Sequence, residues 1–183
     1  MFYAIIRLMK TALKFVLLFL LVGGLVMLIP FFGFGKSLEA VAADAARLFG
    51  ISPDEYTLTI ERGRVVTAAG ESVNGMIWST MDARGNFHFD ITIRRSISRP
   101  FTIATIFHEF AHAAQSKFNL CYGEFTSEQH AELLAFHMMM RSNYWWNGLH
   151  MLMTHSFRTK PSDYLVAGTL WNMAFTGNSP VYI

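Results

Sequence analysis

The sequence has little cysteine and little net charge, and each shortage narrows the classes of protein to consider. Cys121 is the only cysteine among 183 residues, so no disulfide can form within the chain and a disulfide-stapled scaffold is excluded. The formal net charge is only +2, and its basic excess lies at the N-terminus: from Ser37 onward eleven basic residues stand against thirteen acidic ones. That part of the chain has no basic patch, so we expect no nucleic-acid partner.

Charged residues are also missing from one long apolar run near the N-terminus. Residues 15–35 contain no charged side chain and lie between Lys14 and Lys36. Twenty-one residues of helix span about 30 Å of hydrocarbon. The run therefore predicts one transmembrane helix, within an anchor of residues 1–36. Three basic residues before the run and one after it favour a cytoplasmic N-terminus, which predicts a single-pass membrane protein with an extracytoplasmic domain.

A cleaved signal peptide is the alternative for the same segment, because it too has a basic start and an apolar core. The only A-x-A candidate is Ala40-Val41-Ala42, which follows Pro30 and Lys36 and lies too far from the apolar core. We therefore expect an uncleaved anchor, followed by one domain of residues 37–183.

The first half of that domain changes from helical to extended patterns. Ser37 is a good N-cap for a helix whose apolar residues recur at helical spacing until Gly50, a plausible residue to end it. Short extended runs separated by turn residues then cover 56–61, 64–67, 75–81 and 87–95. The last run alternates apolar and polar residues, which is typical of a strand with one buried face.

The second half is helical again. Ser98-Arg99-Pro100 suits the start of a helix that runs to about Phe118, and Thr126 or Ser127 suits the N-cap of the next one. Farther on, Tyr144-Trp145-Trp146 is predicted to pack on the core, and a final helix is predicted from Ser162-Asp163 to about Ala174. Strands followed by helices predict an α+β fold.

The first of these late helices contains the pattern His108-Glu109-Phe110-Ala111-His112. Two histidines four residues apart point from the same face of a helix, so both imidazoles can bind one Zn²⁺ ion. Zinc with three protein ligands keeps a fourth position for a water whose pKa falls to about 7. Glu109 is placed to accept the proton of that water and deliver it to a leaving amine, as a catalytic general base.

A third ligand should follow, because two histidines leave a catalytic zinc one protein ligand short. The next helix offers Glu128 and Glu132, four residues apart on one face. One can bind the metal while the other supports a ligand imidazole by hydrogen bonding. A solvated acidic face is the alternative for this pair. His130 and His137 lie on a different face and are interpreted as packing or surface histidines.

These patterns resemble the gluzincin class of zinc metallopeptidases. In detail they are similar to the small ImmA/IrrE-type members, whose active-site helix commonly follows a Phe-Thr-Ile-Ala-like stretch and whose second helix carries Glu-x-x-Ala. Here the stretch is Phe101-Thr102-Ile103-Ala104, and three residues intervene between it and His108. The second helix has Glu128-x-x-Ala131. Ala111 stands before the second histidine, where the family usually has a glycine. The match covers about residues 85–140.

The resemblance implies a zincin-like domain with a short, mostly antiparallel sheet packed on the active-site helices. It implies that strand 87–95 is the edge strand beside the motif helix, where an extended peptide could add by main-chain hydrogen bonds. It also implies Glu128 as the metal ligand with Glu132 supporting it, although the nineteen residues between His112 and Glu132 match the spacing of larger thermolysin-like members. A Tyr or His should stabilise the oxyanion, with Tyr122, Tyr164, His150 and His155 as candidates.

The leading functional hypothesis is a membrane-anchored, zinc-dependent metallopeptidase that hydrolyses protein or peptide near the bilayer. The alternative is a catalytically silent zinc-binding domain that works through interaction. Glu109 favours the enzyme, because zinc binding alone does not need it. An intramembrane protease is disfavoured, because Arg99 and Lys117 bracket the motif helix with only seventeen residues between them.

Overall fold

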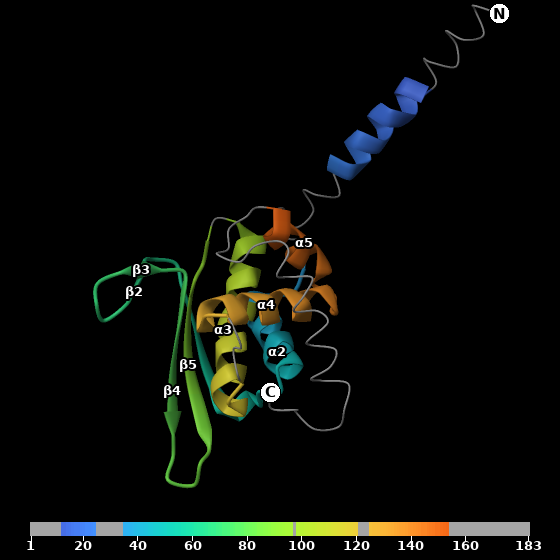
Figure 1. Cartoon of the computed structure of the whole chain (residues 1–183). Helices are drawn as coiled ribbons and strands as arrows, with labels where there is room; N and C mark the ends of the chain where they lie inside the picture. Colours follow the sequence, from blue (N-terminus) through green and yellow to red (C-terminus); the bar gives the residue numbers. More distant parts are fainter. Residues whose placement is uncertain (1–11, 25–34, 97, 121–124, 154–183) are drawn as a thin grey trace, which may run out of the picture. The chain divides into compact units, whose positions relative to one another are not determined.

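A computed structural model describes residues 12–24, 35–96, 98–120 and 125–153 of the chain (Figure 1). The chain divides into two compact units, Met1–Gly35 and Lys36–Ile183. Within the first unit the described residues 12–24 are α-helical and their side chains are exposed.

No helix in these described ranges is both long enough and apolar enough to cross a membrane. The prediction of a transmembrane helix over 15–35 is therefore wrong, and so is the predicted localisation as a single-pass membrane protein with an extracytoplasmic domain. Of the predicted span, residues 15–24 are described and helical, and residues 25–34 lie outside the described residues.

The second unit has an α+β fold, as predicted. Its described elements are α2 (Leu38–Leu48), the short 3-10 helix η2 (Pro53–Glu55), β1 (Tyr56–Glu61), β2 (Val65–Val66), β3 (Ser72–Val73), β4 (Gly75–Met81), β5 (Phe87–Arg94), α3 (Arg99–Phe118), α4 (Ser127–Met140) and α5 (Trp145–Met153). The predicted helices and strands agree with this order to within one or two residues, apart from the unpredicted η2, β3 and α5. The predicted helix from Ser162 to Ala174 lies outside the described residues.

Three strands form the main sheet in the order β1-β5-β4. β5 pairs in parallel with β1 and antiparallel with β4, so this sheet is mixed. β2 and β3 form a separate antiparallel pair. The expectation that strand 87–95 is the edge strand is wrong, because β5 is central and, among the described residues, β4 pairs only with β5. Pairing order is a long-range property that the alternation within one strand does not reveal.

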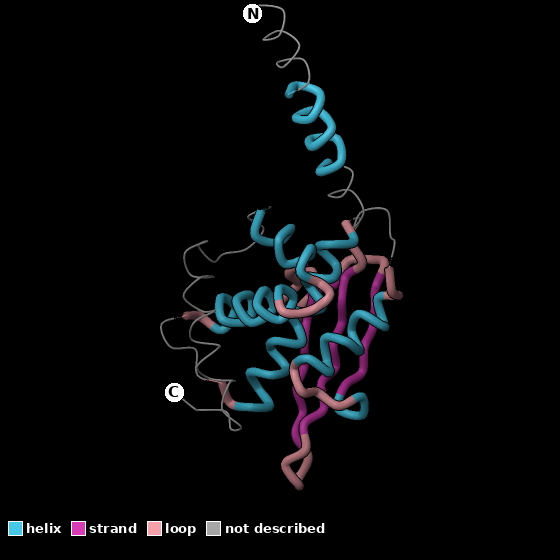
Figure 2. Tube along the Cα trace, turned by 90° about the vertical axis from the view of Figure 1, so that its right-hand side faces the viewer, coloured by secondary structure: helices cyan, strands magenta, loops and turns pink. Residues whose placement is uncertain are grey.

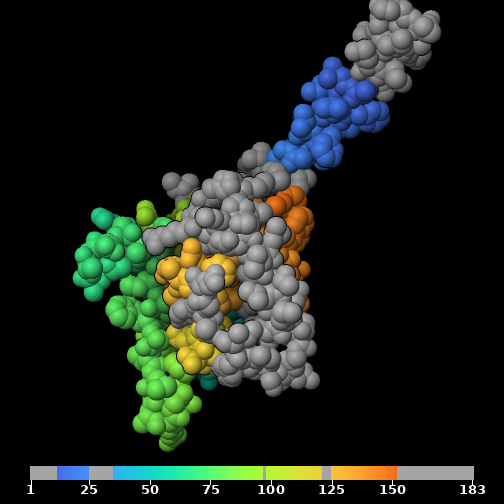
Figure 3. Space-filling view, viewed as in Figure 1, coloured from blue at the N-terminus to red at the C-terminus, as the bar shows by residue number. Residues whose placement is uncertain are grey.

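The described helices of this unit cover one face of the main sheet, as the two perpendicular views show (Figures 1 and 2). Phe89, Ile91 and Ile93 of β5 point into that layer and are fully buried, as the period of two requires. The space-filling view shows the β2–β3 pair and the turn between β4 and β5 standing clear of the helices (Figure 3).

Helix α3 is the centre of the fold. Thirteen of its twenty residues are buried, because α2, α4, α5 and the sheet all pack against it. It ends at Asn119, whose φ of 47° is the left-handed conformation common after a helix. The Lys117 ammonium near this end donates to Glu55 and to the Gly50 carbonyl oxygen. These contacts fix α3, and with it the histidine pair, against the N-terminal part of the unit.

Candidate metal centre

Helix α3 presents His108 and His112 on one face, as their spacing predicted. The two Nε2 atoms lie 3.1 Å apart. Two neutral imidazoles cannot satisfy each other when both of these atoms carry lone pairs, because neither then has a proton to donate. Without a metal, an Nε2–H of one ring can donate to Nε2 of the other; when both rings carry their proton on Nδ1, a metal ion between the rings would satisfy both lone pairs.

Helix α4 supplies the third group. Thr126 caps the helix by accepting from Gln129 N, which places Glu128 in the first turn, where the helix dipole favours a carboxylate. Glu128 Oε2 lies 3.2 Å from His108 Nε2, and Glu128 Oε1 lies 3.3 Å from His112 Nε2. His108, His112 and Glu128 thus bring three ligand atoms within 4.8 Å of one another.

These separations fit a zinc site. Tetrahedral zinc holds nitrogen and oxygen ligands at about 2.0–2.2 Å, which puts neighbouring ligand atoms about 3.3 Å apart. The two Nε2 atoms lie 3.1 Å apart, and Oε2 and Oε1 of Glu128 lie 3.2 and 3.3 Å from them. Each of these distances is close to that spacing. Two imidazoles and one carboxylate are also a known donor set for zinc with one open position. This group could therefore hold a metal ion with little movement of its side chains.

The charges of the metal-free site are strongly coupled. Hydrogen bonds from His108 and His112 hold the pKa of Glu128 well below its ordinary value. Burial alone would lower the pKa of His112, but its hydrogen bond with Glu128 and the charge of Glu109 outweigh burial, and the pKa is raised. The site therefore attracts positive charge even though it is partly removed from water.

Glu109 lies in the same pocket and is only 6% exposed. Burial raises its pKa, against the opposing effect of the two histidines. A raised pKa brings a carboxylate closer to the value that suits a general base near neutral pH.

Gly75 at the start of β4 makes room for this carboxylate. A Cβ atom at Gly75 would lie 2.4 Å from Glu109 Oε1 and 2.8 Å from its Cγ and Cδ. The φ of Gly75 is not in the left-handed region, so close approach and not backbone conformation requires glycine here. Strand β4 thereby forms the wall against which the Glu109 side chain rests.

We expect Gly75→Ala to destabilise the protein by about 1–3 kcal/mol, because the added methyl overlaps the buried Glu109 side chain. Denaturant unfolding of the purified chain would measure the change. Gly63→Ala is the matched control, since a Cβ there meets no atom within 4 Å.

A double-mutant cycle separates this contact from other effects of the new methyl. In a Glu109→Ala background the cost of Gly75→Ala should largely disappear, because the side chain that it strikes is gone. An equal cost in both backgrounds would show that Gly75 does not act through Glu109.

Glu132 lines the same pocket from α4 and is only 5% exposed. It does not belong to the group of three close ligand atoms, which contains Glu128 instead. The assignment of Glu128 as the ligand and Glu132 as the supporting residue stays a prediction.

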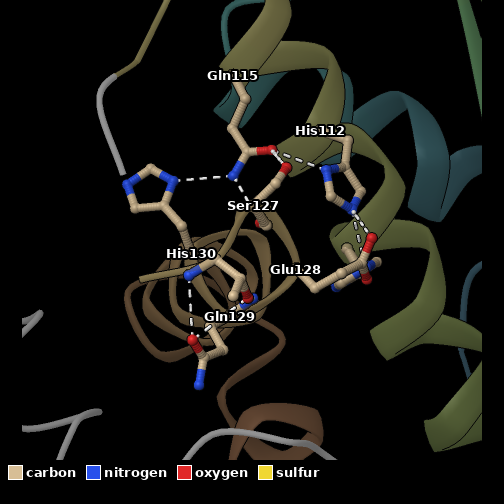
Figure 4. Close-up of polar contacts among 8 residues, drawn as sticks. His112, Gln115, Ser127, Glu128, Gln129 and His130 are labelled. Carbon is tan, nitrogen blue, oxygen red and sulfur yellow. Dashed lines mark hydrogen bonds and ion pairs between the residues drawn. The ribbon is translucent and has the colours of Figure 1, made fainter. Parts of the chain in front are cut away.

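Gln115 links the ligand helices (Figure 4). Its side-chain oxygen lies 2.7 Å from His112 Nδ1, and its side-chain nitrogen donates to the Ser127 carbonyl oxygen at 3.0 Å. The same nitrogen lies 2.9 Å from His130 Nδ1. Burial and the nearby His112 lower the pKa of His130 to about 4, so His130 is neutral near pH 7 and can accept this hydrogen bond. The interpretation of His130 as a packing histidine agrees with this position.

The pocket has a volume of about 730 Å³ and is open to solvent, which is the size of a small-ligand site. Beside the site residues it is lined by β4, by Ser72 to Asn74 before it, and by Phe101 and Thr105 of α3. Of the predicted oxyanion donors, His150 lies on α5 and does not line this pocket. Tyr122, His155 and Tyr164 lie outside the described residues.

Two residues of this site were not anticipated, although the sequence carries a signal for each. Gly75 is an isolated glycine at the start of a predicted strand, which can mark a close backbone approach. Gln115 lies three residues after His112 on a predicted helix, a spacing that brings side chains together. Neither pattern identifies the residue that Gly75 or Gln115 contacts.

Comparison with known proteins identifies no relative: no family model, no curated protein and no solved structure matches this chain. The likeness to gluzincins therefore rests on the residues of the motif and on the geometry of the site.

Proposed function

We propose that this protein is a zinc-dependent metallopeptidase. His108, His112 and Glu128 would hold the metal, and Glu109 would be the general base. The observation that carries the proposal is the pair of histidine Nε2 atoms 3.1 Å apart, with the two oxygens of Glu128 at 3.2 and 3.3 Å from them and a buried carboxylate in the same pocket. A zinc-binding domain without catalysis needs the three ligands but has no use for a buried Glu109, whose burial is costly.

The roles of the side chains follow from peptide chemistry. When bound, zinc would polarise the scissile carbonyl and lower the pKa of a water to about 7. Glu109 accepts a proton from that water as its oxygen attacks the carbonyl carbon. Glu109 then donates the proton to the amide nitrogen, the C–N bond breaks, and a carboxylic acid and an amine leave.

Strand β4 is the part of the pocket best suited to a peptide. Gly75, Met76, Ile77 and Ser79 line the pocket along one strand. Among the described residues, β4 pairs on one side only, with β5. An extended peptide can add to such a free edge through main-chain hydrogen bonds. This supports a protein or peptide substrate.

The proposal is tested by assaying the purified chain on casein and on a peptide library, with and without a chelator. We expect cleavage that the chelator abolishes and that added zinc restores. Zinc bound without any cleavage would instead favour the silent interaction domain. Cleavage that survives removal of the metal would contradict the proposed chemistry.

A further inference from the structure

The hydrogen bonds of Gln115 have only one consistent direction. Its side-chain amide faces the main-chain oxygen of Ser127 at 3.0 Å, and a carbonyl oxygen can only accept. The NH₂ group must therefore point to Ser127, which leaves the amide oxygen 2.7 Å from His112 Nδ1. That oxygen can only accept, so Nδ1 of His112 must carry a proton.

A proton on Nδ1 decides what the other ring nitrogen can do. In a neutral imidazole with Nδ1–H, the lone pair is on Nε2. Nε2 of His112 is the atom that faces His108 Nε2 at 3.1 Å and Glu128 Oε1 at 3.3 Å. Gln115 thus selects the tautomer in which His112 can bind a metal at that point.

Gln115 is itself held firmly. Its side chain is 3% exposed, and Ser127 Oγ donates to its oxygen at 3.2 Å. Its NH₂ group reaches both the Ser127 carbonyl and His130 Nδ1. Ser127 and His130 lie on either side of Glu128 in α4, so one amide joins the α3 ligand His112 to the helix turn that carries the third ligand (Figure 4).

The two histidines differ in this respect. His108 Nδ1 is buried and has no hydrogen-bond partner among the described residues. Glu128 Oε2 faces His108 Nε2 at 3.2 Å, whereas no described group hydrogen-bonds His108 Nδ1, so the orienting effect of Gln115 on a ring Nδ1 atom falls on His112 alone.

We propose that Gln115 is a positioning residue that locks the Nδ1–H tautomer of His112 and holds the first turn of α4 against α3. The inference rests on the proposed metal site. It adds a determinant of metal affinity that lies outside the three ligands and outside the residues that would contact substrate. Orienting partners of this kind typically change metal affinity or activity by about 10 to 100-fold.

Two variants separate the acceptor function of the Gln115 amide from its donor function. Gln115→Leu removes both the acceptor for His112 and the donor for Ser127. Gln115→Glu keeps an acceptor for His112 Nδ1 but removes the donor. Ser127→Ala is the matched control, because it removes the Ser127 hydroxyl and leaves the main-chain carbonyl that orients Gln115.

The first measurement is the histidine ring ¹⁵N spectrum of the metal-free full chain at a pH above the raised pKa of His112, where the ring is neutral and the spectrum distinguishes its two tautomers. His112 should be the Nδ1–H form in the parent, in Ser127→Ala and in Gln115→Glu, and should lose that preference in Gln115→Leu. The second is the zinc dissociation constant by chelator competition. It should rise about 10 to 100-fold in Gln115→Leu and be partly rescued in Gln115→Glu.

Parental affinity together with an unchanged tautomer in Gln115→Leu would overturn the inference. If Gln115→Leu does not fold, the Nε2–H form of His112 in Gln115→Glu would overturn it equally. If the parent binds no zinc, the proposed function fails, yet the tautomer spectrum of the metal-free chain still decides the role of Gln115.

Discussion

Replacing Glu109 with glutamine should reduce peptide hydrolysis by about 10²–10⁴-fold, the usual contribution of a general base, and should leave the zinc content unchanged. Glutamine has the size of glutamate, so the contact with Gly75 is kept. The glutamine amide, unlike the glutamate carboxylate, cannot accept the proton of the attacking water. The three ligand atoms belong to other side chains, His108, His112 and Glu128, and are not altered.

Glu61→Gln on strand β1 is the matched control, because it removes one carboxylate from an exposed position that does not line the pocket. It should leave both hydrolysis and zinc content at the parental level. Equal activity of Glu109→Gln and the parent would contradict the proposed mechanism, and loss of zinc in that variant would give Glu109 a role in holding the metal instead.

Replacing Glu128 with alanine should nearly abolish zinc retention, whereas Glu132→Ala should weaken it by only about 10 to 100-fold, as loss of a supporting group does. Glu128 has both carboxylate oxygens directed at the histidine pair, at 3.2 and 3.3 Å. Glu132 lines the pocket one helical turn farther on but lies outside the group of close ligand atoms.

Zinc retained after dialysis against a weak chelator measures this order of severity. Circular dichroism of each metal-free variant controls for loss of α4. If Glu132→Ala loses more zinc than Glu128→Ala, then Glu132 is the ligand, and the site has the ligand spacing of the larger thermolysin-like gluzincins.

Local patterns predicted most of the secondary structure. The spacing of Leu38, Val41, Ala42 and Ala45 predicted α2, and these residues are buried together. The alternation of Phe89, Ile91 and Ile93 predicted β5 with its buried face. The pairing order was not predictable, because the parallel partner of β5 is β1, about thirty residues earlier in the chain.

The prediction from the apolar N-terminal run was wrong. Its composition predicted one long helix over residues 15–35, yet no helix of the described residues is both long enough and apolar enough to cross a membrane. Apolar composition alone does not establish a helix of the length that a span needs. The short helix α5 was not predicted, because Trp145, Trp146 and Gly148 give little helical signal without the packing of α5 on α3 and α4.

The same difference between local and long-range information applies to the candidate site. The histidine pair and Glu109 follow from four-residue spacing on a single helix, which is local information. The closeness of Glu128 to that pair depends on how α4 packs against α3. The zinc ligand count predicted a third ligand at Glu128 or Glu132, and only the family resemblance favoured Glu128. Gly75 and Gln115 act through contacts with Glu109 and with Ser127, which only the folded arrangement reveals.

The most direct test of this account is the zinc content of the purified full chain, measured by elemental analysis and expressed per chain. The account predicts one zinc ion per chain, removed by a strong chelator and restored by added zinc, with the His108→Ala, His112→Ala and Glu128→Ala variants far below that value. A parent chain that binds no zinc when the metal is supplied, or that binds it equally well without His108 and His112, would contradict the account.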